Sequence, residues 1–141
     1  MHEREYAAAL LIERLVQDTY PDRQPSSIKP LQWSILRYLR QVGDSPVDIS
    51  TISKYLGKTN APVSRAVSTL ERRGLLLKGN TVGSASVAIT LTEEGRDARR
   101  SDPILQFASW IASVSGHEKE TFLKTVRQIA MVANRQNLED K

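Results

Sequence analysis

The clearest chemical pattern in this sequence is a cluster of basic side chains near its middle. Between residues 54 and 78 six basic residues stand against one acidic residue, Glu71, which gives this segment +5 and leaves −1 for the rest of a chain whose net charge is +4. The basic residues are Lys54, Lys58, Arg65, Arg72, Arg73 and Lys78. A local excess of this kind is typical of a surface that binds nucleic acid, although a solvated basic face with no partner has the same composition.

The segment that carries most of these charges, residues 60–73, has the pattern of an amphipathic helix. Its apolar residues follow the i, i+3, i+4, i+7 spacing of one helix face: Val63, Ala66, Val67 and Leu70. The opposite face carries Ser64, Arg65, Ser68, Arg72 and Arg73. Asn60 or Ala61 is the expected N-cap, Pro62 suits the first turn because its missing N–H would be unpaired there, and Gly74 ends the helix.

Two helices are predicted between residue 31 and this segment. The first spans residues 31–41, and its apolar face consists of Leu31, Ile35, Leu36 and Leu39, with Trp33 beside them. After a turn and a very short strand at VDI, Ser50 is expected to cap a short helix that Gly57 stops. The residues of this short helix expected to face inward are Ile52, Tyr55 and Leu56.

A β-hairpin is predicted after the basic helix. LLLK forms the first strand, GNTVGS contains the turn, and ASVAITL alternates so that Val87, Ile89 and Leu91 share one side. Thr92 is then a good N-cap for a helix that opens with TEEG.

Helix, short helix, tight turn, basic helix and hairpin follow one another in the order of a winged helix-turn-helix. A DNA major groove about 12 Å wide accepts one α-helix, which reads base edges mainly with its N-terminal residues. The residues expected near base edges are Pro62, Ser64, Arg65 and Ser68. Arg65 is the best candidate for sequence recognition, because its planar guanidinium can donate two hydrogen bonds to O6 and N7 of guanine. The residues expected near phosphates are Lys58, Thr59, Asn60, Arg72, Arg73 and Lys78. The N-terminus of the preceding short helix can face a further phosphate.

The same residues resemble the MarR family of bacterial transcription regulators. The strings LQWSIL, ISTISKYLG, PVSRAVSTLERRGLL and VAITLTEEG carry this resemblance, which covers residues 29–100 closely. It implies a mainly α fold with a small hairpin and an obligate homodimer, in which N- and C-terminal helices interlock to hold two DNA-reading heads. A two-fold dimer in turn predicts a near-palindromic operator on double-stranded DNA.

The flanking segments agree with dimerisation, because they carry more apolar surface than a small winged core can cover. The sequence therefore divides into an N-terminal helix and linker (1–28), a DNA-binding domain (29–100) and C-terminal helices (101–141). The residues expected at the dimer interface are Leu11, Leu15, Leu105, Trp110, Phe122, Val126 and Ile129. Packing of these helices within one chain is the alternative.

The wing departs from the family pattern. Relatives carry Asp-x-Arg in the wing, whereas the matching positions here are Gly83, Ser84 and Ala85, and no charge occurs between Lys78 and Glu93. The wing is then expected either to become ordered only on binding or to contact phosphates through Lys78, Asn80, Thr81, Ser84 and backbone amides alone. An uncharged wing also suits the alternative function, a winged-helix module for protein–protein contact that has weakened or lost DNA binding.

Other function classes find little support. The chain has no cysteine and two separated histidines, so thiol chemistry is excluded and neither a metal site nor a cofactor is expected. Glu93 and Glu94 are adjacent on a helix and cannot face each other, so they do not form a catalytic carboxylate pair and no enzyme is expected. No segment suits a membrane span, and the apolar N-terminal segment is interrupted by charges unlike a signal peptide, so the expected location is cytoplasmic.

The resemblance also implies a small aromatic or phenolic ligand, because many relatives bind such compounds between the dimer helices and the winged domain. Trp33 and Trp110 could line such a pocket, but a tryptophan on an apolar face is more often part of a core. The sequence leaves open the effector, the operator and the direction of regulation.

Overall fold

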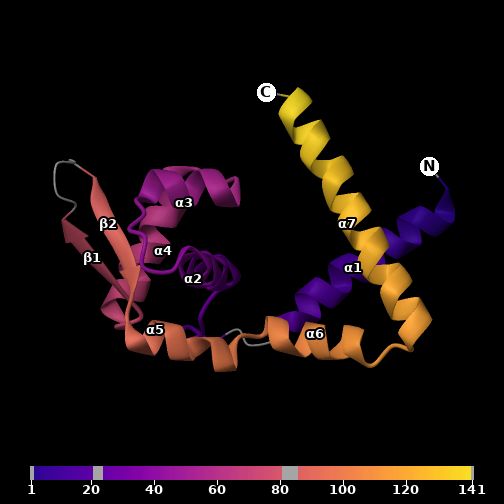
Figure 1. Cartoon of the computed structure of the whole chain (residues 1–141), viewed down its shortest axis with the longest axis horizontal. Helices are drawn as coiled ribbons and strands as arrows, with labels where there is room; N and C mark the ends of the chain where they lie inside the picture. The colour runs from indigo at the N-terminus through magenta and orange to yellow at the C-terminus, as the bar shows by residue number, and fades with distance from the viewer. Residues whose placement is uncertain (1, 21–23, 81–85, 141) are drawn as a thin grey trace. The chain divides into compact units, whose positions relative to one another are not determined.

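The computed structural model describes residues 2–20, 24–80 and 86–140. The chain divides into two compact units, which we call the core unit (residues 20–102) and the helical unit (residues 1–19 and 103–141). The prediction of a mainly α fold with a small β-hairpin is confirmed (Figure 1).

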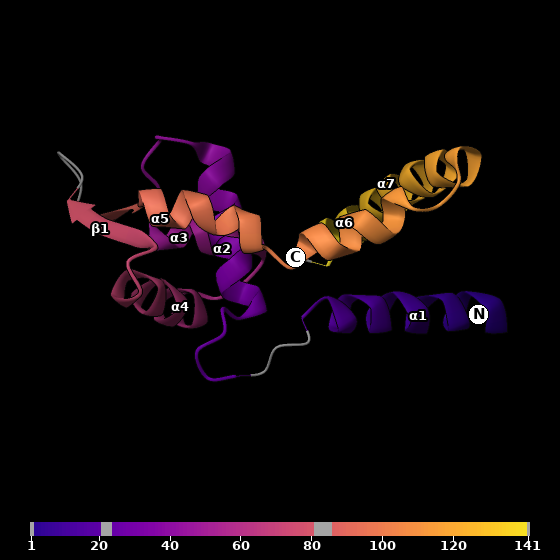
Figure 2. The ribbon, with the colours of Figure 1, turned by 90° about the horizontal axis from the view of Figure 1, so that it is seen from below.

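The core unit contains the elements predicted for a winged helix-turn-helix, in the predicted order. They are α2 (Pro30–Val42), α3 (Ile49–Leu56), α4 (Asn60–Arg72), β1 (Leu76–Asn80), β2 (Val87–Leu91), α5 (Glu93–Asp97) and the 3-10 turn η1 (Ala98–Ser101). Helix α4 packs against α2, α3 and β1, and the hairpin extends from one side of this group (Figures 1 and 2).

One apolar cluster holds the core unit together. The predicted buried face of α4 is confirmed, since Val63, Ala66, Val67 and Leu70 are all buried. They meet Ile35, Leu36 and Leu39 from α2, Ile52 from α3, and Leu76, Ile89 and Leu91 from the hairpin. Trp33 is buried in the same cluster rather than lining an open surface. Because the inner face of α4 packs in this cluster, the helix is fixed in place and its opposite face forms a rigid, outward-facing surface.

Two details of the predicted short helix are wrong, and so is the strand predicted just before it. Its N-cap is Asp48 rather than Ser50, because the Asp48 carboxylate accepts hydrogen bonds from the backbone N–H and the hydroxyl of Thr51, both at 2.8 Å. Tyr55 is 57% exposed instead of inward, and its ring stacks on Tyr38 with centroids 4.2 Å apart. The strand expected at VDI is reduced to one bridge, in which Ile89 donates its N–H to the Val47 carbonyl.

The hairpin is antiparallel, with Leu76 opposite Leu91 and Lys78 opposite Ile89. Ile89 and Leu91 face the core as predicted, but Val87 does not, because at 42% exposure it lies beyond the reach of the core helices. Thr92 caps α5 as predicted by accepting a hydrogen bond from the Gly95 N–H.

Gly95 explains how the end of the hairpin packs on its start. A Cβ on Gly95 would stand 1.9 Å from the Leu75 carbonyl oxygen, so only glycine allows this approach. Thr92 completes the junction by donating its hydroxyl to the Gly74 carbonyl at 2.6 Å and its N–H to the Leu75 carbonyl.

A buried ion pair joins the two ends of the core unit. Arg37 on α2 donates to both carboxylate oxygens of Asp102, at 2.6 and 2.8 Å, and to the hydroxyl of Tyr20 at 3.0 Å. The Asp102 side chain is 2% exposed. The hydrogen bond to Asp102 is the largest cause that raises the pKa of Arg37. These hydrogen bonds link Tyr20 and Asp102, which lie at the two ends of the core unit, to helix α2.

The helical unit consists of α1 (Glu3–Thr19), α6 (Ile104–Ala112) and α7 (Gly116–Glu139), and α1 packs along α6. Of its large apolar side chains, many are exposed, and α6 and α7 have no buried residue among those described. No described helix is long and apolar enough to cross a membrane.

Candidate nucleic-acid interface

The turn between α3 and α4 sets the angle at which α4 is presented. Gly57 adopts a left-handed conformation (φ 64°), and the Lys58 N–H donates to the Ser53 carbonyl at 2.9 Å. This is a Schellman closure, which needs glycine because side chains disfavour positive φ. Helix α4 ends with the same Schellman motif, in which Gly74 has φ 75° and the Leu75 N–H donates to the Leu70 carbonyl. Both ends of the presented helix are therefore fixed by backbone geometry.

The outward face of α4 carries the predicted reading residues. Ser64 and Arg65 are exposed, whereas Pro62 and Ser68 are half-buried. Among the described residues, the guanidinium of Arg65 has no hydrogen-bond or ion-pair partner, so its donors are available to a ligand. Arg65 lies one turn from the start of the helix, which is where a helix in the major groove contacts base edges.

Lys78 on β1 connects the hairpin to α4. Its ammonium donates to the Ser68 hydroxyl at 2.9 Å, and its backbone N–H donates to the Glu71 carboxylate at 3.1 Å. One of the three ammonium donors is thereby used, and two remain for a phosphate. The contact also orients Ser68, because its oxygen accepts from Lys78 and its own proton can point outward. The sequence does not predict this link, since the two residues lie on different elements.

Arg72 and Arg73 are both exposed at the far end of α4. Arg72 donates to the Thr69 hydroxyl at 3.3 Å and so lies along its own helix. Arg73 is the C-cap residue, one position before Gly74. The two arginines extend the positive surface beyond the reading residues.

The N-terminus of α4 is open toward solvent. The N-cap is Thr59 rather than the predicted Asn60 or Ala61, and its side chain makes no capping hydrogen bond. Lys58, Thr59 and Asn60 are all exposed. Backbone N–H groups and the positive end of the helix dipole thus combine with Lys58 at one place, which favours a phosphate.

The N-terminus of α3 is different, because an aspartate caps it and opposes the approach of a phosphate that was predicted there. The Asp48 carboxylate already accepts the N–H of Thr51 there, so a second anion would be repelled. Hydrogen bonds from the Thr51 N–H and hydroxyl lower the pKa of Asp48 and keep it charged. An aspartate three residues before a threonine is the signal that would have identified this cap.

The predicted wing contacts are only partly described. Asn80 ends β1, opposite Val87. Thr81, Gly83, Ser84 and Ala85 lie outside the described residues.

The predicted dimerisation residues lie on the helical unit with apolar side chains in contact with solvent. Leu11, Leu15, Leu105, Phe122, Val126 and Ile129 are exposed, and Trp110 is half-buried against Phe107. Among the described residues no cluster of three metal-binding side chains occurs.

A known protein family matches the part of the chain that contains these elements. Residues 28–95 match the family model described as a winged helix DNA-binding domain. The middle of this chain is therefore similar to winged helix DNA-binding domains. The match includes α2, the presented helix α4, both strands and the Thr92–Gly95 junction.

Solved structures extend the likeness over nearly the whole chain. MepR, a transcription regulator of the Staphylococcus aureus multidrug efflux pump MepA, has a TM-score of 0.72 at 19% identity, over 94% of this chain and 99% of that one. The PcaV transcriptional regulator from Streptomyces coelicolor, solved with its natural ligand, has a TM-score of 0.64 at 22% identity, over 94% of each chain. A probable transcriptional regulator from Pseudomonas aeruginosa has a TM-score of 0.69 at 17% identity, over 86% of this chain and 96% of that one.

At these identities the likeness concerns the fold, which includes the helices on both sides of the winged helix domain. With the matched domain, it confirms the predicted winged helix fold and its resemblance in fold to transcription regulators of known structure. No curated protein matches this chain significantly.

Proposed function

We propose that this protein is a sequence-specific, double-stranded DNA-binding transcription regulator that acts as a homodimer in the cytoplasm. The observation that carries the proposal is the two-sided character of α4. One face is buried in the core of a winged helix domain, and the other presents Ser64 and Arg65 next to an open helix N-terminus. This is the geometry that a major-groove reader requires.

The proposal assigns different tasks to the residues of this surface. Arg65, with Ser64, Ser68 and Pro62, reads base edges. Lys58, Thr59, Asn60, Arg72, Arg73 and Lys78 hold phosphates, and Asn80, Thr81 and Ser84 add contacts from the wing. Only the first group should distinguish one sequence from another, because phosphates are the same in every sequence.

The exposed apolar surface of the helical unit supports the proposed dimer. Exposed apolar side chains on α1, α6 and α7 are unfavourable in water, and a second copy of the chain would bury them. Such a dimer would also place two α4 helices on one side of the DNA. An isologous dimer requires a near-palindromic operator with half-sites about one helical turn apart. Occupation of such an operator acts most simply as repression. We further propose that a small aromatic effector regulates the protein by changing the distance between the two α4 helices of the dimer. Among the similar structures, PcaV is solved with its natural ligand.

Selection of bound sequences from random DNA, followed by fluorescence anisotropy across a salt series, tests the proposal. We expect enrichment of a two-fold symmetric site. Four cationic phosphate contacts per protomer, Lys58, Arg72, Arg73 and Lys78, predict a slope of log affinity against log salt of roughly −7 for a dimer.

A flat salt dependence and no enriched sequence would reject DNA recognition. Co-purification of a protein partner that protects α4 in that case would instead favour the protein–protein module.

A further inference from the structure

Ser68 differs from the other residues assigned to base edges, because its hydroxyl is hydrogen-bonded to a charged side chain. The Lys78 ammonium on β1 donates to the Ser68 oxygen on α4 at 2.9 Å. The Lys78 N–H donates to the Glu71 carboxylate at 3.1 Å, which holds the strand beside the helix at this point. Among the described residues no carboxylate lies within ion-pair distance of the ammonium, so its charge is not neutralised. The hydroxyl and the ammonium therefore form a charge-assisted pair between two elements.

The hydroxyl of Ser68 keeps an unused proton in this pair. A serine hydroxyl can donate once and accept twice, whereas an ammonium can only donate, so the Ser68 oxygen must be the acceptor. In the described part of the chain no group accepts the Ser68 proton. The neighbouring Thr69 differs, because its hydroxyl donates to the Arg65 carbonyl at 3.1 Å and accepts from Arg72 at 3.3 Å. Ser68 thus has a proton for a ligand, and Thr69 has none.

The positive charge beside this proton decides which group of a base can approach it. An ammonium attracts the partial negative charge of an acceptor and repels the partial positive charge of an N–H donor. In the major groove guanine presents two adjacent acceptors, N7 and O6, whereas cytosine presents an amino donor. The Ser68 oxygen and the Lys78 nitrogen are two donors side by side, 2.9 Å apart, and they match the two acceptors of guanine.

We propose that Ser68 is a specificity-determining residue that selects a guanine, through a hydroxyl proton that Lys78 directs toward N7 or O6. In this role Lys78 is a positioning residue. The selected guanine is close to the base that Arg65 contacts, because Ser68 lies one turn further along the same face of α4. Cytosine is the base most strongly excluded at this position. The proposal rests on the proposed function, since it names the base that one residue of that surface selects.

Selection of bound sequences from random DNA, with the full wild-type chain and with Ser68→Ala, tests the proposal. The variant should lose a preference for guanine at one position of each half-site and keep its preferences elsewhere. Fluorescence anisotropy then compares DNA with guanine or cytosine at that position. We expect the wild type to prefer guanine by about tenfold, the effect of one charge-assisted hydrogen bond, and Ser68→Ala to show almost no preference.

Lys78→Met tests the positioning role. It should reduce the same guanine preference although Ser68 is present, and in combination with Ser68→Ala it should reduce the preference no further, because the two residues act as one unit. A lysine that only contacts a phosphate would instead contribute equally to binding of both DNA sequences. Thr69→Val removes a hydroxyl with no unused proton and should leave the guanine preference unchanged.

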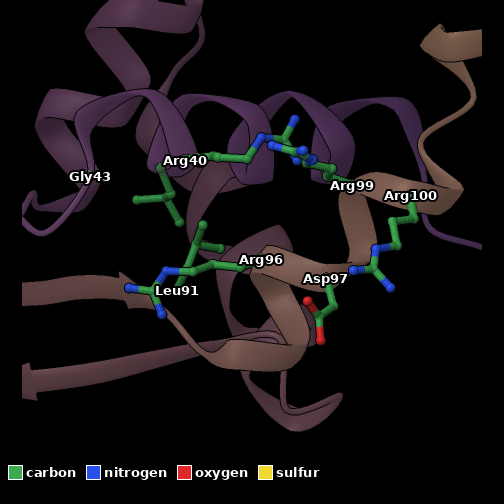
Figure 3. A pocket seen from close by; sticks show the side chains of 8 residues that line it. Arg40, Gly43, Leu91, Arg96, Asp97, Arg99 and Arg100 are labelled. Carbon is green, nitrogen blue, oxygen red and sulfur yellow. The ribbon is translucent and has the colours of Figure 1, made fainter.

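The core unit also provides a charge control for Lys78→Met. A second group of basic side chains lines a cleft between the end of α2, the end of β2 and the α5–η1 segment (Figure 3). None of the residues that line this cleft belongs to α4 or β1. Arg100 is an exposed member of the group, so Arg100→Gln removes one positive charge without changing the pair. This variant should keep the guanine preference of the wild type.

The proposal is overturned if Ser68→Ala selects the same bases as the wild type at every position, or if the lost preference is for a base other than guanine. It is also overturned if Lys78→Met keeps the full preference, or if Arg100→Gln reduces it equally. In each of these cases the wild type still selects a sequence, so the proposed function stands. If the wild type selects no sequence, the proposed function fails and this proposal fails with it.

Discussion

The core unit and the helical unit use the same kind of sequence pattern with opposite results. In the core unit, apolar residues at helical spacing are buried, so that the inner face of α4 is almost fully covered. In the helical unit, α1, α6 and α7 have comparable apolar stripes, yet Leu11 is 63% and Ile129 56% exposed. Periodicity thus predicts where an apolar face lies and says nothing about which surface covers it.

The difference separates two kinds of stability. The core unit contains its own apolar cluster and its own buried ion pair, so its folding should depend little on protein concentration. In the proposed dimer the apolar surface of the helical unit is covered by a second copy, so the stability of this unit should rise with protein concentration. Each prediction below tests one side of this contrast.

The largest effect is expected for Leu11→Glu on the helical unit. In a two-fold dimer the change occurs twice, and each lost leucine burial is worth about 1.5–3 kcal/mol, so dimerisation should weaken by about 4 kcal/mol, or roughly a thousandfold. Sedimentation velocity should then detect monomers at concentrations where the wild type is dimeric. Gln17→Glu adds the same charge at an exposed polar position of α1 and should remain dimeric. If both variants stay dimeric, α1 does not form the interface.

Gly95→Ala should be the most damaging small substitution in the core unit. Its Cβ would stand 1.9 Å from the Leu75 carbonyl oxygen, a backbone atom that cannot rotate away. We expect a loss of about 3 kcal/mol or more in the free energy of unfolding, measured by urea denaturation. Gly79→Ala is the matched control, because its Cβ would meet nothing within 4 Å. Equal stability of the two variants would contradict the close approach.

Asp102→Asn should destabilise the core unit by somewhat less, about 2–3 kcal/mol. The substitution leaves the Arg37 guanidinium without its bidentate partner, although that side chain is 25% exposed and water can solvate part of it. Differential scanning calorimetry should record a lower Tm, with the dimer dissociation constant unchanged. Asp97→Asn removes a charge from a nearby exposed position and is expected to have a much smaller effect.

The smallest effect is expected from the cap of α3. Because hydrogen bonds lower the pKa of Asp48, its contribution to stability is complete above the usual aspartate range and is lost as the pH falls through the lowered pKa. Asp48→Asn should therefore reduce the Tm slightly at neutral pH, and the difference from the wild type should vanish in acid. A difference that grows as the pH falls would have the wrong sign for this cap.

Much of the core unit could be predicted from spacing and turn residues. The buried face of α4, the stops at Gly57 and Gly74, and the Thr92 cap all depend on residues close together in sequence, where periodicity and backbone preference decide the structure. The errors arose where a neighbour competes. Asp48 is a better cap than Ser50, and Tyr55 stacks on Tyr38 instead of entering the core.

The parts that could not be predicted join residues far apart in the chain. Arg37 with Asp102, Lys78 with Ser68, and Gly95 against Leu75 each depend on a fold that brings separate elements together. The residues of the DNA surface could be chosen from charge and helix face, but the role of each as reader or phosphate contact stays a prediction.

The most direct test of the account compares Arg65→Ala and Arg73→Ala on the selected site and on scrambled DNA, by fluorescence anisotropy over a salt series. Arg65→Ala should weaken binding to the selected site by about 1–3 kcal/mol and have little effect on scrambled DNA. Arg73→Ala should weaken both equally and reduce the salt slope by about 1 for each contact removed. Equal losses on both sequences for Arg65→Ala would show that Arg65 holds a phosphate, and the assignment of α4 as the reading helix through Arg65 would be wrong.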